Sequence, residues 1–251
     1  MLINFFMNSF LSWIPTLILA PLLFVQGRYV RRVTPKLPEP PGVRRGEDGG
    51  GRPLTILILG DSSAVGVGAS NQSNALAGRL VSQLATNFSV SWRLMGESGL
   101  TTSELVALVA DSPPDMFDVV IIAIGVNDVI AGRRTRDWIT ELSRLVALLR
   151  NNFAASHILF SPLPPMHCFT ALPQPLRWCV GLRAHRFNHE LFKFAQREAR
   201  CRVVPLNYPL QPGYLASDGF HPGELAYAYW AGVLADEIRQ LHLDMWQAAS
   251  V

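Results

Sequence analysis

Residues 55–70 read TILILGDSSAVGVGAS, and this stretch decides the fold class. The run from Thr55 to Leu59 is short, apolar and rich in β-branched residues, which predicts a buried strand. It ends at Gly60 in a turn of small residues that leads toward a helix. In an α/β protein the carboxyl ends of strands open into a crevice, and the first N–H groups of a helix are unpaired there. Ser62 lies on this turn and is therefore a candidate nucleophile.

Three other motifs with glycine-rich turns fit this stretch less well. A phosphate-binding loop requires a Lys directly after its last glycine, but Val67 follows Gly66. A dinucleotide fingerprint requires a third glycine where Asn71 stands. The elbow G-x-S-x-G of α/β-hydrolases is nearly met, with Ala64 in place of its last glycine. The remaining candidate residues must therefore decide the chemistry.

Downstream of this turn, predicted helices and strands alternate. Apolar runs predict strands at 90–94, 118–124, 157–161 and 202–206, and periodic segments predict helices at 74–88, 102–110, 137–151, 177–200 and 223–241. Continuous apolar strands that alternate with helices are typical of a parallel sheet covered on both faces. We therefore expect an α/β fold, a three-layer α/β/α domain with a five-stranded parallel sheet.

Charge divides the 251 residues into three parts. Residues 1–27 carry no charged side chain, residues 28–52 are rich in Pro and Gly with seven basic and three acidic side chains, and residues 53–251 are almost neutral. We expect an N-terminal hydrophobic membrane anchor, a basic linker and a catalytic domain with these bounds. Because the positive charge belongs to the linker, no nucleic-acid-binding surface is expected on the domain.

The expected anchor is the uncharged run from Leu2 to Val25, which Pro15 and Pro21 interrupt. As a helix it would extend roughly 36 Å, more than the thickness of about 30 Å of a bilayer core. The basic residues that follow it predict an inner-membrane anchor with a cytoplasmic catalytic domain, and a periplasmic domain is the alternative. The prolines leave open a helix that lies in the membrane interface.

The three cysteines, Cys168, Cys179 and Cys201, form neither a C-x-x-C pair nor a zinc-like spacing with His. We therefore expect neither a disulfide scaffold nor a structural zinc site, and we expect the three thiols to be reduced.

Three further stretches lie at predicted turns and carry groups suited to acyl transfer. In Asp218-Gly219-Phe220-His221-Pro222, the Asp precedes the His by three residues, so its carboxylate can orient the ring while the other ring nitrogen faces a nucleophile. Asn127 offers a side-chain amide, and Gly99 an unshielded backbone N–H, to a developing oxyanion. Taken singly, the D-x-x-H stretch and the stretch at Gly99 are better explained as turns, and Asn127 can be a turn residue or a helix cap.

In this order, GDS, the turn at Gly99, GVND and DGFH resemble the four sequence blocks of the SGNH (GDSL-type) hydrolase superfamily of bacterial esterases and lipases. The resemblance covers roughly residues 53–241. It implies a flavodoxin-like sheet and a triad of Ser62, His221 and Asp218 that uses no metal and no cofactor. It also implies that the oxyanion hole consists of the backbone of Ser62 and Gly99 and the side chain of Asn127.

The chain departs from the family pattern at two positions. The first block reads GDSS rather than GDSL, and Leu94 stands where many members have an Asn in the second block. Between the third and fourth blocks, residues 162–180 are rich in Pro and contain Met166, Phe169 and Trp178, which we expect to line an acyl-chain site. An ordinary loop packed on the domain is the alternative.

Taken together, the sequence predicts a serine hydrolase that cleaves carboxylic esters, lipid-like or short-acyl, as an esterase, lipase or lysophospholipase does. Three alternatives stay open. The chain can act as a carbohydrate O-acetyl esterase, as a thioesterase or acyltransferase of the same family, or as a non-catalytic protein that has kept the fold.

Overall fold

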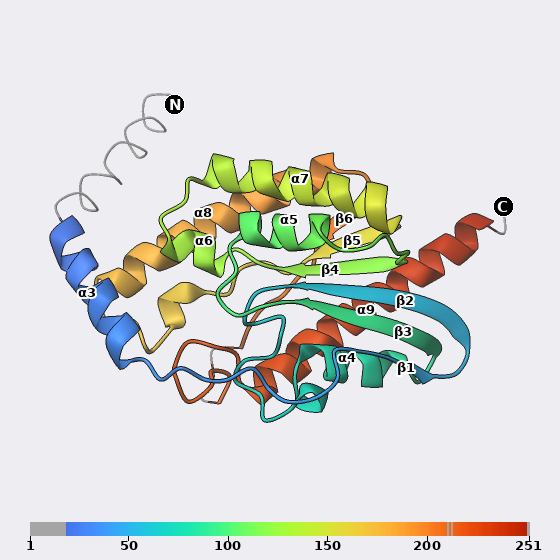
Figure 1. Ribbon diagram of the computed structural model, residues 1–251, viewed down its shortest axis with the longest axis horizontal. Coiled ribbons are helices and arrows are strands. Elements are labelled where there is room, and N and C mark those ends of the chain that lie inside the picture. The colour runs from blue at the N-terminus through green and yellow to red at the C-terminus, as the bar shows by residue number, and fades with distance from the viewer. Residues whose placement is uncertain (1–18, 210, 212, 250–251) are drawn as a thin grey trace.

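A six-stranded sheet forms the middle layer of the computed structural model, which describes residues 19–209, 211 and 213–249 (Figure 1). Its strands are β1 (Arg45–Gly49), β2 (Arg52–Gly60), β3 (Phe88–Gly96), β4 (Val119–Ala123), β5 (His157–Phe160) and β6 (Cys201–Val203). They lie in the order β1-β3-β2-β4-β5-β6. All neighbours pair in parallel except β1, which runs antiparallel to β3.

The five predicted parallel strands are confirmed. Without β1, the sheet contains the second, first, third, fourth and fifth parallel strands in that order, which is the flavodoxin-like arrangement. The expected three-layer α/β/α class is therefore correct, with one antiparallel edge strand added to it.

Helices cover both faces of the sheet (Figure 1). One face is covered by α5 (Thr102–Ala110), α6 (Val126–Ile130), α7 (Thr135–Phe153) and α8 (Leu176–Arg197). The other face is covered by α4 (Leu76–Leu84), next to the 3-10 helix η1 (Gln72–Asn74), and by α9 (Glu224–Ala249). A second 3-10 helix, η2 (Met166–Cys168), precedes α8.

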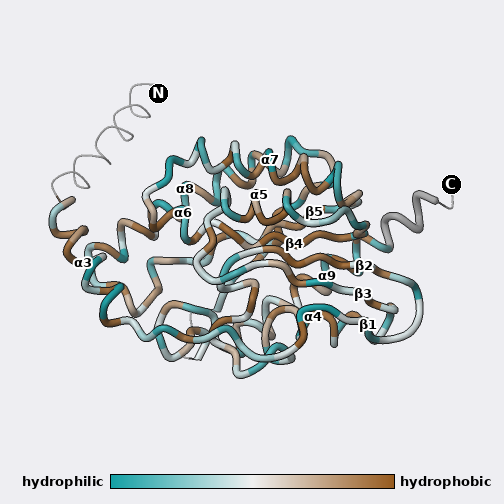
Figure 2. Tube along the Cα trace, viewed as in Figure 1, coloured by the Kyte–Doolittle hydropathy of each residue, from teal (hydrophilic) through white to brown (hydrophobic). Residues whose placement is uncertain are grey.

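Successive side chains of β2 point to opposite faces of the sheet, so this strand contributes to the hydrophobic cores on both faces. Leu57 and Leu59 pack into the core under α5–α8, whereas Ile56 and Ile58 pack into the core under α4 and α9. All four side chains are fully buried, and each contributes about 1.5–3 kcal/mol of stability relative to an exposed position. The central strands β2 and β4 accordingly stand out as apolar in Figure 2.

Strands β2 and β3 end in glycine at the carboxyl edge of the sheet, because the backbones approach closely there. A Cβ added at Gly60 would lie 2.0 Å from the carbonyl oxygen of Ala123, and one added at Gly96 would lie 2.1 Å from that of Gly60. Any larger residue at either position would push neighbouring strands apart.

Part of the expected linker belongs to the sheet. Residues 45–49 form β1, which pairs with β3. Its last residue, Gly49, lies against the start of β3, where an added Cβ would lie 2.4 Å from the carbonyl oxygen of Phe88. The residues RGEDG carry no strand pattern because β1 is a mostly exposed edge strand, whose charged side chains oppose pairing with another chain.

The expected membrane-anchored localisation requires correction. Across residues 19–209, 211 and 213–249, no helix combines the length and the apolar character that crossing a membrane requires. The last residues of the expected anchor belong to α3 (Ala20–Val33), which has only 14 residues and includes Arg28, Arg31 and Arg32. Gln26 attaches α3 to the start of α8 by hydrogen bonds with Gln174 and Leu176. Residues 1–18, the greater part of the expected anchor, lie outside the described residues.

Candidate active site

The predicted site stretches meet at the carboxyl edge of the sheet. Gly60, the last residue of β2, pairs in register with Gly96 at the end of β3 and with Ala123 at the end of β4. The turns that carry Ser62, Gly99 and Asn127 therefore follow neighbouring strands at the same edge of the sheet. This convergence follows from the parallel arrangement of the strands.

The loop before α9 brings the fourth stretch to the same edge. Tyr227 of α9 is fully buried, and its hydroxyl donates a hydrogen bond of 2.8 Å to the carbonyl oxygen of Val67 in the turn after Ser62. The segment before it is closed by a bridge between Leu215 and Pro222. These contacts hold His221 over the turn of β2.

Asp218, His221 and Ser62 form a hydrogen-bonded relay. The Nδ1 atom of His221 lies 2.5 Å from Oδ2 of Asp218, and Nε2 lies 3.0 Å from Oγ of Ser62. Because a carboxylate can only accept, the Nδ1–H donates to Asp218, and this leaves Nε2 free to accept the proton of the Ser62 hydroxyl. The geometry is that of a base positioned to deprotonate a nucleophile.

The three-residue spacing of the D-x-x-H stretch has a structural reason. The Oδ1 atom of Asp218 accepts hydrogen bonds of 3.0 Å from the backbone N–H groups of Phe220 and His221, while Oδ2 accepts from the His221 ring. Burial alone would raise the pKa of Asp218, but these hydrogen bonds outweigh it and hold the pKa below its usual value. Asp218 therefore stays ionised and holds both the turn and the ring.

The candidate oxyanion donors lie beside one another. The Nδ2 atom of Asn127 donates a hydrogen bond of 2.9 Å to the carbonyl oxygen of Leu100, the residue after Gly99. Within the described part of the chain, the backbone N–H groups of Ser62 and Gly99 donate no hydrogen bond. Gly99 has a φ of +90°, which favours glycine. The Asn127 amide and the turn at Gly99 are thus joined, and donation by these groups to an oxyanion stays a prediction.

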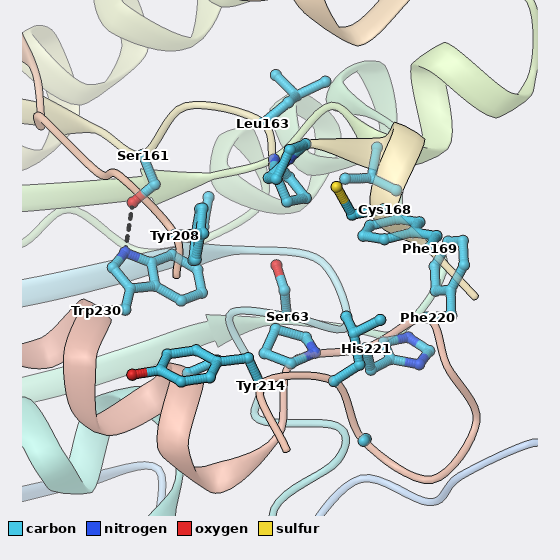
Figure 3. A pocket seen from close by; sticks show the side chains of 18 of the residues that line it. Ser63, Ser161, Leu163, Cys168, Phe169, Tyr208, Tyr214, Phe220, His221 and Trp230 are labelled. Atoms are coloured by element: carbon cyan, nitrogen blue, oxygen red, sulfur yellow. Dashed lines mark hydrogen bonds between the residues drawn. The ribbon is translucent and has the colours of Figure 1, made fainter. Parts of the chain in front are cut away.

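A cavity of about 570 Å³ opens beside the relay (Figure 3). Its wall is mainly apolar and comes from the turns after β2, β4 and β5, the loop before α9, and α9 itself. Phe169 and Phe220 lie against each other with ring centroids 4.8 Å apart, and the Phe220 ring lies 5.1 Å from that of His221. At another part of the wall, the indole N–H of Trp230 donates to the hydroxyl of Ser161 at 3.0 Å.

Asp61, between Gly60 and Ser62, is a buried carboxyl outside the relay. Burial raises its pKa to about 6, and hydrogen bonds from the N–H and hydroxyl of Ser63, at 3.0 and 2.8 Å, oppose that shift. The Ser63 hydroxyl is thereby bound to Asp61. Of the two adjacent serines, Ser62 is the one whose hydroxyl meets His221.

Comparison with known proteins identifies the family of the chain. The sequence profile of the GDSL-like Lipase/Acylhydrolase family matches residues 58–229, more than half of the chain. The chain belongs to this family. A comparison with curated protein sequences finds no match.

Solved structures of other GDSL and esterase proteins share the fold. A member of the lipolytic G-D-S-L family from Veillonella parvula has a TM-score of 0.58 at 16% identity, covering 72% of this chain and 96% of that one. The psychrotrophic esterase EstA from Pseudoalteromonas sp. has a TM-score of 0.55 at 21% identity, covering 75% and 98%. Axe2, an acetylxylan esterase from Geobacillus stearothermophilus, has a TM-score of 0.54 at 19% identity, covering 75% and 95%.

The three residues predicted to contact substrate in this GDSL-family chain have different positions. Phe169 lines the cavity. Met166 is fully buried in the core under α8, and Trp178 is 47% exposed on α8 and does not line the cavity. A Pro-rich loop has no periodicity, so the sequence could not indicate which of its side chains point inward.

Several cavity residues were missed by sequence reasoning. Phe220 lies inside the DGFHP stretch, and the free thiol Cys168 lies inside the Pro-rich stretch 162–180, but neither was singled out as a substrate contact. Tyr208 and Trp230 lie outside every stretch that the sequence indicated. Trp230 carries a helical-period signal that indicates only core packing. Their shared role in one wall follows from tertiary structure alone.

Proposed function

We propose that this GDSL-family esterase cleaves carboxylic esters with an apolar acyl chain through an acyl-enzyme on Ser62. The observation that supports this proposal most strongly is the relay from Asp218 through His221 to Ser62, at the mouth of a mainly apolar cavity. A relay alone serves many substrates, and the cavity makes the acyl chain the part that the protein recognises.

In the first half of the reaction, His221 takes the Ser62 proton at Nε2 while Oγ bonds to the ester carbonyl carbon. The N–H groups of Ser62 and Gly99 and the amide of Asn127 donate to the carbonyl oxygen as it becomes negative. When the tetrahedral intermediate collapses, the C–O bond to the alcohol breaks and His221 gives its proton to the leaving oxygen. Asp218 stabilises the charged imidazole in between.

In the second half, water replaces the alcohol. His221 takes a proton from water, whose oxygen attacks the acyl carbon, and the bond from that carbon to Ser62 Oγ then breaks. The proton returns from His221 to Ser62, and a carboxylic acid leaves.

The experiment is hydrolysis of p-nitrophenyl esters from acetyl to palmitoyl by the full chain, with Ser62→Ala in parallel. Each methylene buried in the cavity contributes about 0.8 kcal/mol, so kcat/KM should rise by up to about fourfold per methylene until the cavity is filled. Ser62→Ala should abolish turnover at every chain length. Wild-type turnover by Ser62→Ala would refute the proposal.

Two alternatives are outcomes of the same assay. The similar structures include an acetylxylan esterase, and at under 25% identity they establish only the fold. Activity confined to the acetyl ester would favour a carbohydrate O-acetyl esterase. Faster turnover of an acyl-CoA, or of an added alcohol acceptor, than of the matched ester with water would favour a thioesterase or acyltransferase.

We also propose that the catalytic unit begins before residue 53. Residues 39–49 contact β3, the turn at Ser98 and the loop after Ser62, so a shortened chain that begins at residue 53 would lack these contacts.

A further inference from the structure

Residues 39–44, which we call the N-terminal strap, contact the turn that carries Gly99. The Oε1 atom of Glu39 accepts two hydrogen bonds from Ser98, one of 2.8 Å from its backbone N–H and one of 2.7 Å from its hydroxyl. The strap lies outside the stretch that the family profile matches, and no motif draws attention to Glu39.

Arg44 fixes the second oxygen of Glu39. Its guanidinium pairs with Oε2 of Glu39 and donates a hydrogen bond of 3.2 Å to the carbonyl oxygen of Gly96. The backbone carbonyl of Arg44 accepts a hydrogen bond of 2.7 Å from Leu94 in β3. This end of the strap is therefore continuous with the sheet.

The other end of the strap is bound to the loop that follows Ser62. Gln72 is buried, and its backbone N–H donates to the carbonyl oxygen of Pro41 at 2.9 Å. Its side-chain amide donates to the carbonyl oxygens of Pro40, at 3.4 Å, and Val65, at 2.8 Å. Glu39 thus has a fixed position relative to both the loop after Ser62 and the turn at Gly99.

The orientation of the Gly99 N–H depends on Ser98, because that N–H belongs to the peptide between the two residues. Gly99 is exposed, and a Cβ built on it would meet nothing within 4 Å, so packing at Gly99 itself does not hold the turn. The turn is held instead by its neighbours: Leu100 by the amide of Asn127, and Ser98 by Glu39.

We propose that Glu39 is a positioning residue, which orients the Gly99 N–H toward the oxyanion by holding Ser98. The inference rests on the proposed function, in which Gly99 is an oxyanion donor. Glu39 touches no reacting atom, so its loss should misplace one donor rather than remove it. Its loss should therefore destabilise the transition state more than it weakens substrate binding.

The contacts of Glu39 favour its carboxylate form, since Oε1 accepts both hydrogen bonds from Ser98 and Oε2 pairs with Arg44. Partial burial raises the pKa of Glu39, but the hydrogen bonds from Ser98 and the charge of Arg44 outweigh it and hold the pKa below its usual value. Glu39 therefore remains ionised in any assay near neutral pH.

The test compares Glu39→Ala, Glu39→Gln and Glu97→Ala in the full chain, with p-nitrophenyl butyrate as the substrate. Glu97 lies in the same turn and is exposed, so Glu97→Ala removes the same charge without touching the Ser98 contact. We expect Glu39→Ala to lower kcat about tenfold with KM within about twofold, a smaller loss than the 10²-fold or more for a missing donor. Glu39→Gln keeps an oxygen acceptor and should recover most of kcat, and Glu97→Ala should match wild type.

Two further variants distinguish a loss of positioning from a folding defect in Glu39→Ala. Ser98→Ala removes only the hydroxyl bond, so it should lower kcat by a few-fold, and Glu39→Ala/Ser98→Ala should lose no more than Glu39→Ala alone. Equal kcat for Glu39→Ala and Glu97→Ala, or an equal loss in Glu39→Gln and Glu39→Ala, would overturn the inference.

Ser62→Ala, measured in parallel, separates the proposed function from the positioning role of Glu39. If it stays active, the proposed function fails. If it is inactive while Glu39→Ala matches Glu97→Ala, only the positioning role fails.

Discussion

At the scale of single residues, the two oxygens of Asp218 have separate roles. Oδ1 holds the backbone of the turn, and Oδ2 holds the ring of His221. The sequence predicted this contact from the D-x-x-H spacing, and it placed Ser62 and Asn127 at the same edge because their stretches follow parallel strands. It could not predict the strongly raised pKa of the Asp61 carboxyl, since burial raises that pKa.

Asp218→Asn should inactivate the enzyme without unfolding it. The amide oxygen can still accept the two backbone N–H groups, but an amide NH₂ in place of Oδ2 favours the wrong His221 tautomer. We expect kcat to fall about 10⁴-fold, with the thermal unfolding temperature within a few degrees of wild type. A loss of less than tenfold would show that the relay does not drive the reaction.

Asp61→Asn should stabilise the protein in a pH-dependent way. Its folded-state pKa is raised from 3.8 to about 6, so the native state binds more protons than the unfolded state between these values. The ionised Asp61 carboxylate therefore lowers the free energy of unfolding by its full amount above about pH 6, and it has no such effect below about pH 4. Asn removes up to about 3 kcal/mol of that cost at pH 8, less the penalty for a buried amide N–H without a partner.

Urea unfolding of wild type and Asp61→Asn at pH 8 and pH 4 checks this expectation. The variant should gain stability relative to wild type as the pH rises through this window. A difference that does not change with pH would contradict the shifted pKa of Asp61.

At the scale of elements, burial decided which strands could be predicted. The four central strands are mostly buried and were found from their sequence pattern, as was the short edge strand β6, whereas β1 is polar and mostly exposed and was not found. Helix α6 was also missed, because five residues are too few to show a helical period. The boundary predicted at residue 53 rests on composition, and composition carries no signal for the pairing of β1 with β3.

Gly96→Ala should disrupt the sheet edge that supports the site. The added Cβ would lie 2.1 Å from the carbonyl oxygen of Gly60, on the strand that carries Ser62. We expect a loss of more than about 2 kcal/mol in the free energy of unfolding, together with lower kcat. Gly50→Ala is the matched control, since a Cβ there meets nothing within 4 Å and should cost little. Similar stability of the two variants would contradict the close approach of β2 and β3.

At the scale of the whole molecule, the cavity is assembled from segments far apart in the sequence. Its wall combines the turn after β2 with η2, the loop before α9 and α9 itself. Sequence motifs described the reacting groups well because these lie at strand ends. They described the wall poorly because it depends on how loops pack. The substrate preference is therefore a property of the tertiary structure.

Cys168→Phe should shorten the preferred acyl chain. Cys168 lines the cavity, and a larger side chain there removes space that methylene groups would fill. We expect kcat/KM for the octanoyl ester to fall about tenfold or more, with little change for the acetyl ester. His167→Phe is the matched control, because His167 is the neighbour of Cys168 in the chain and lies outside the cavity wall. An equal effect on both esters would mean that the acyl chain does not enter this cavity.

The central claim is that Ser62 is the nucleophile, and covalent labelling tests it most directly. The full chain is treated with a fluorophosphonate, and the modified residue is located by mass spectrometry in wild type, Ser62→Ala and Ser63→Ala. We expect one adduct, on Ser62, in wild type and in Ser63→Ala, and none in Ser62→Ala. An adduct on any other residue of the wild-type chain, or folded protein that stays unlabelled, would contradict it.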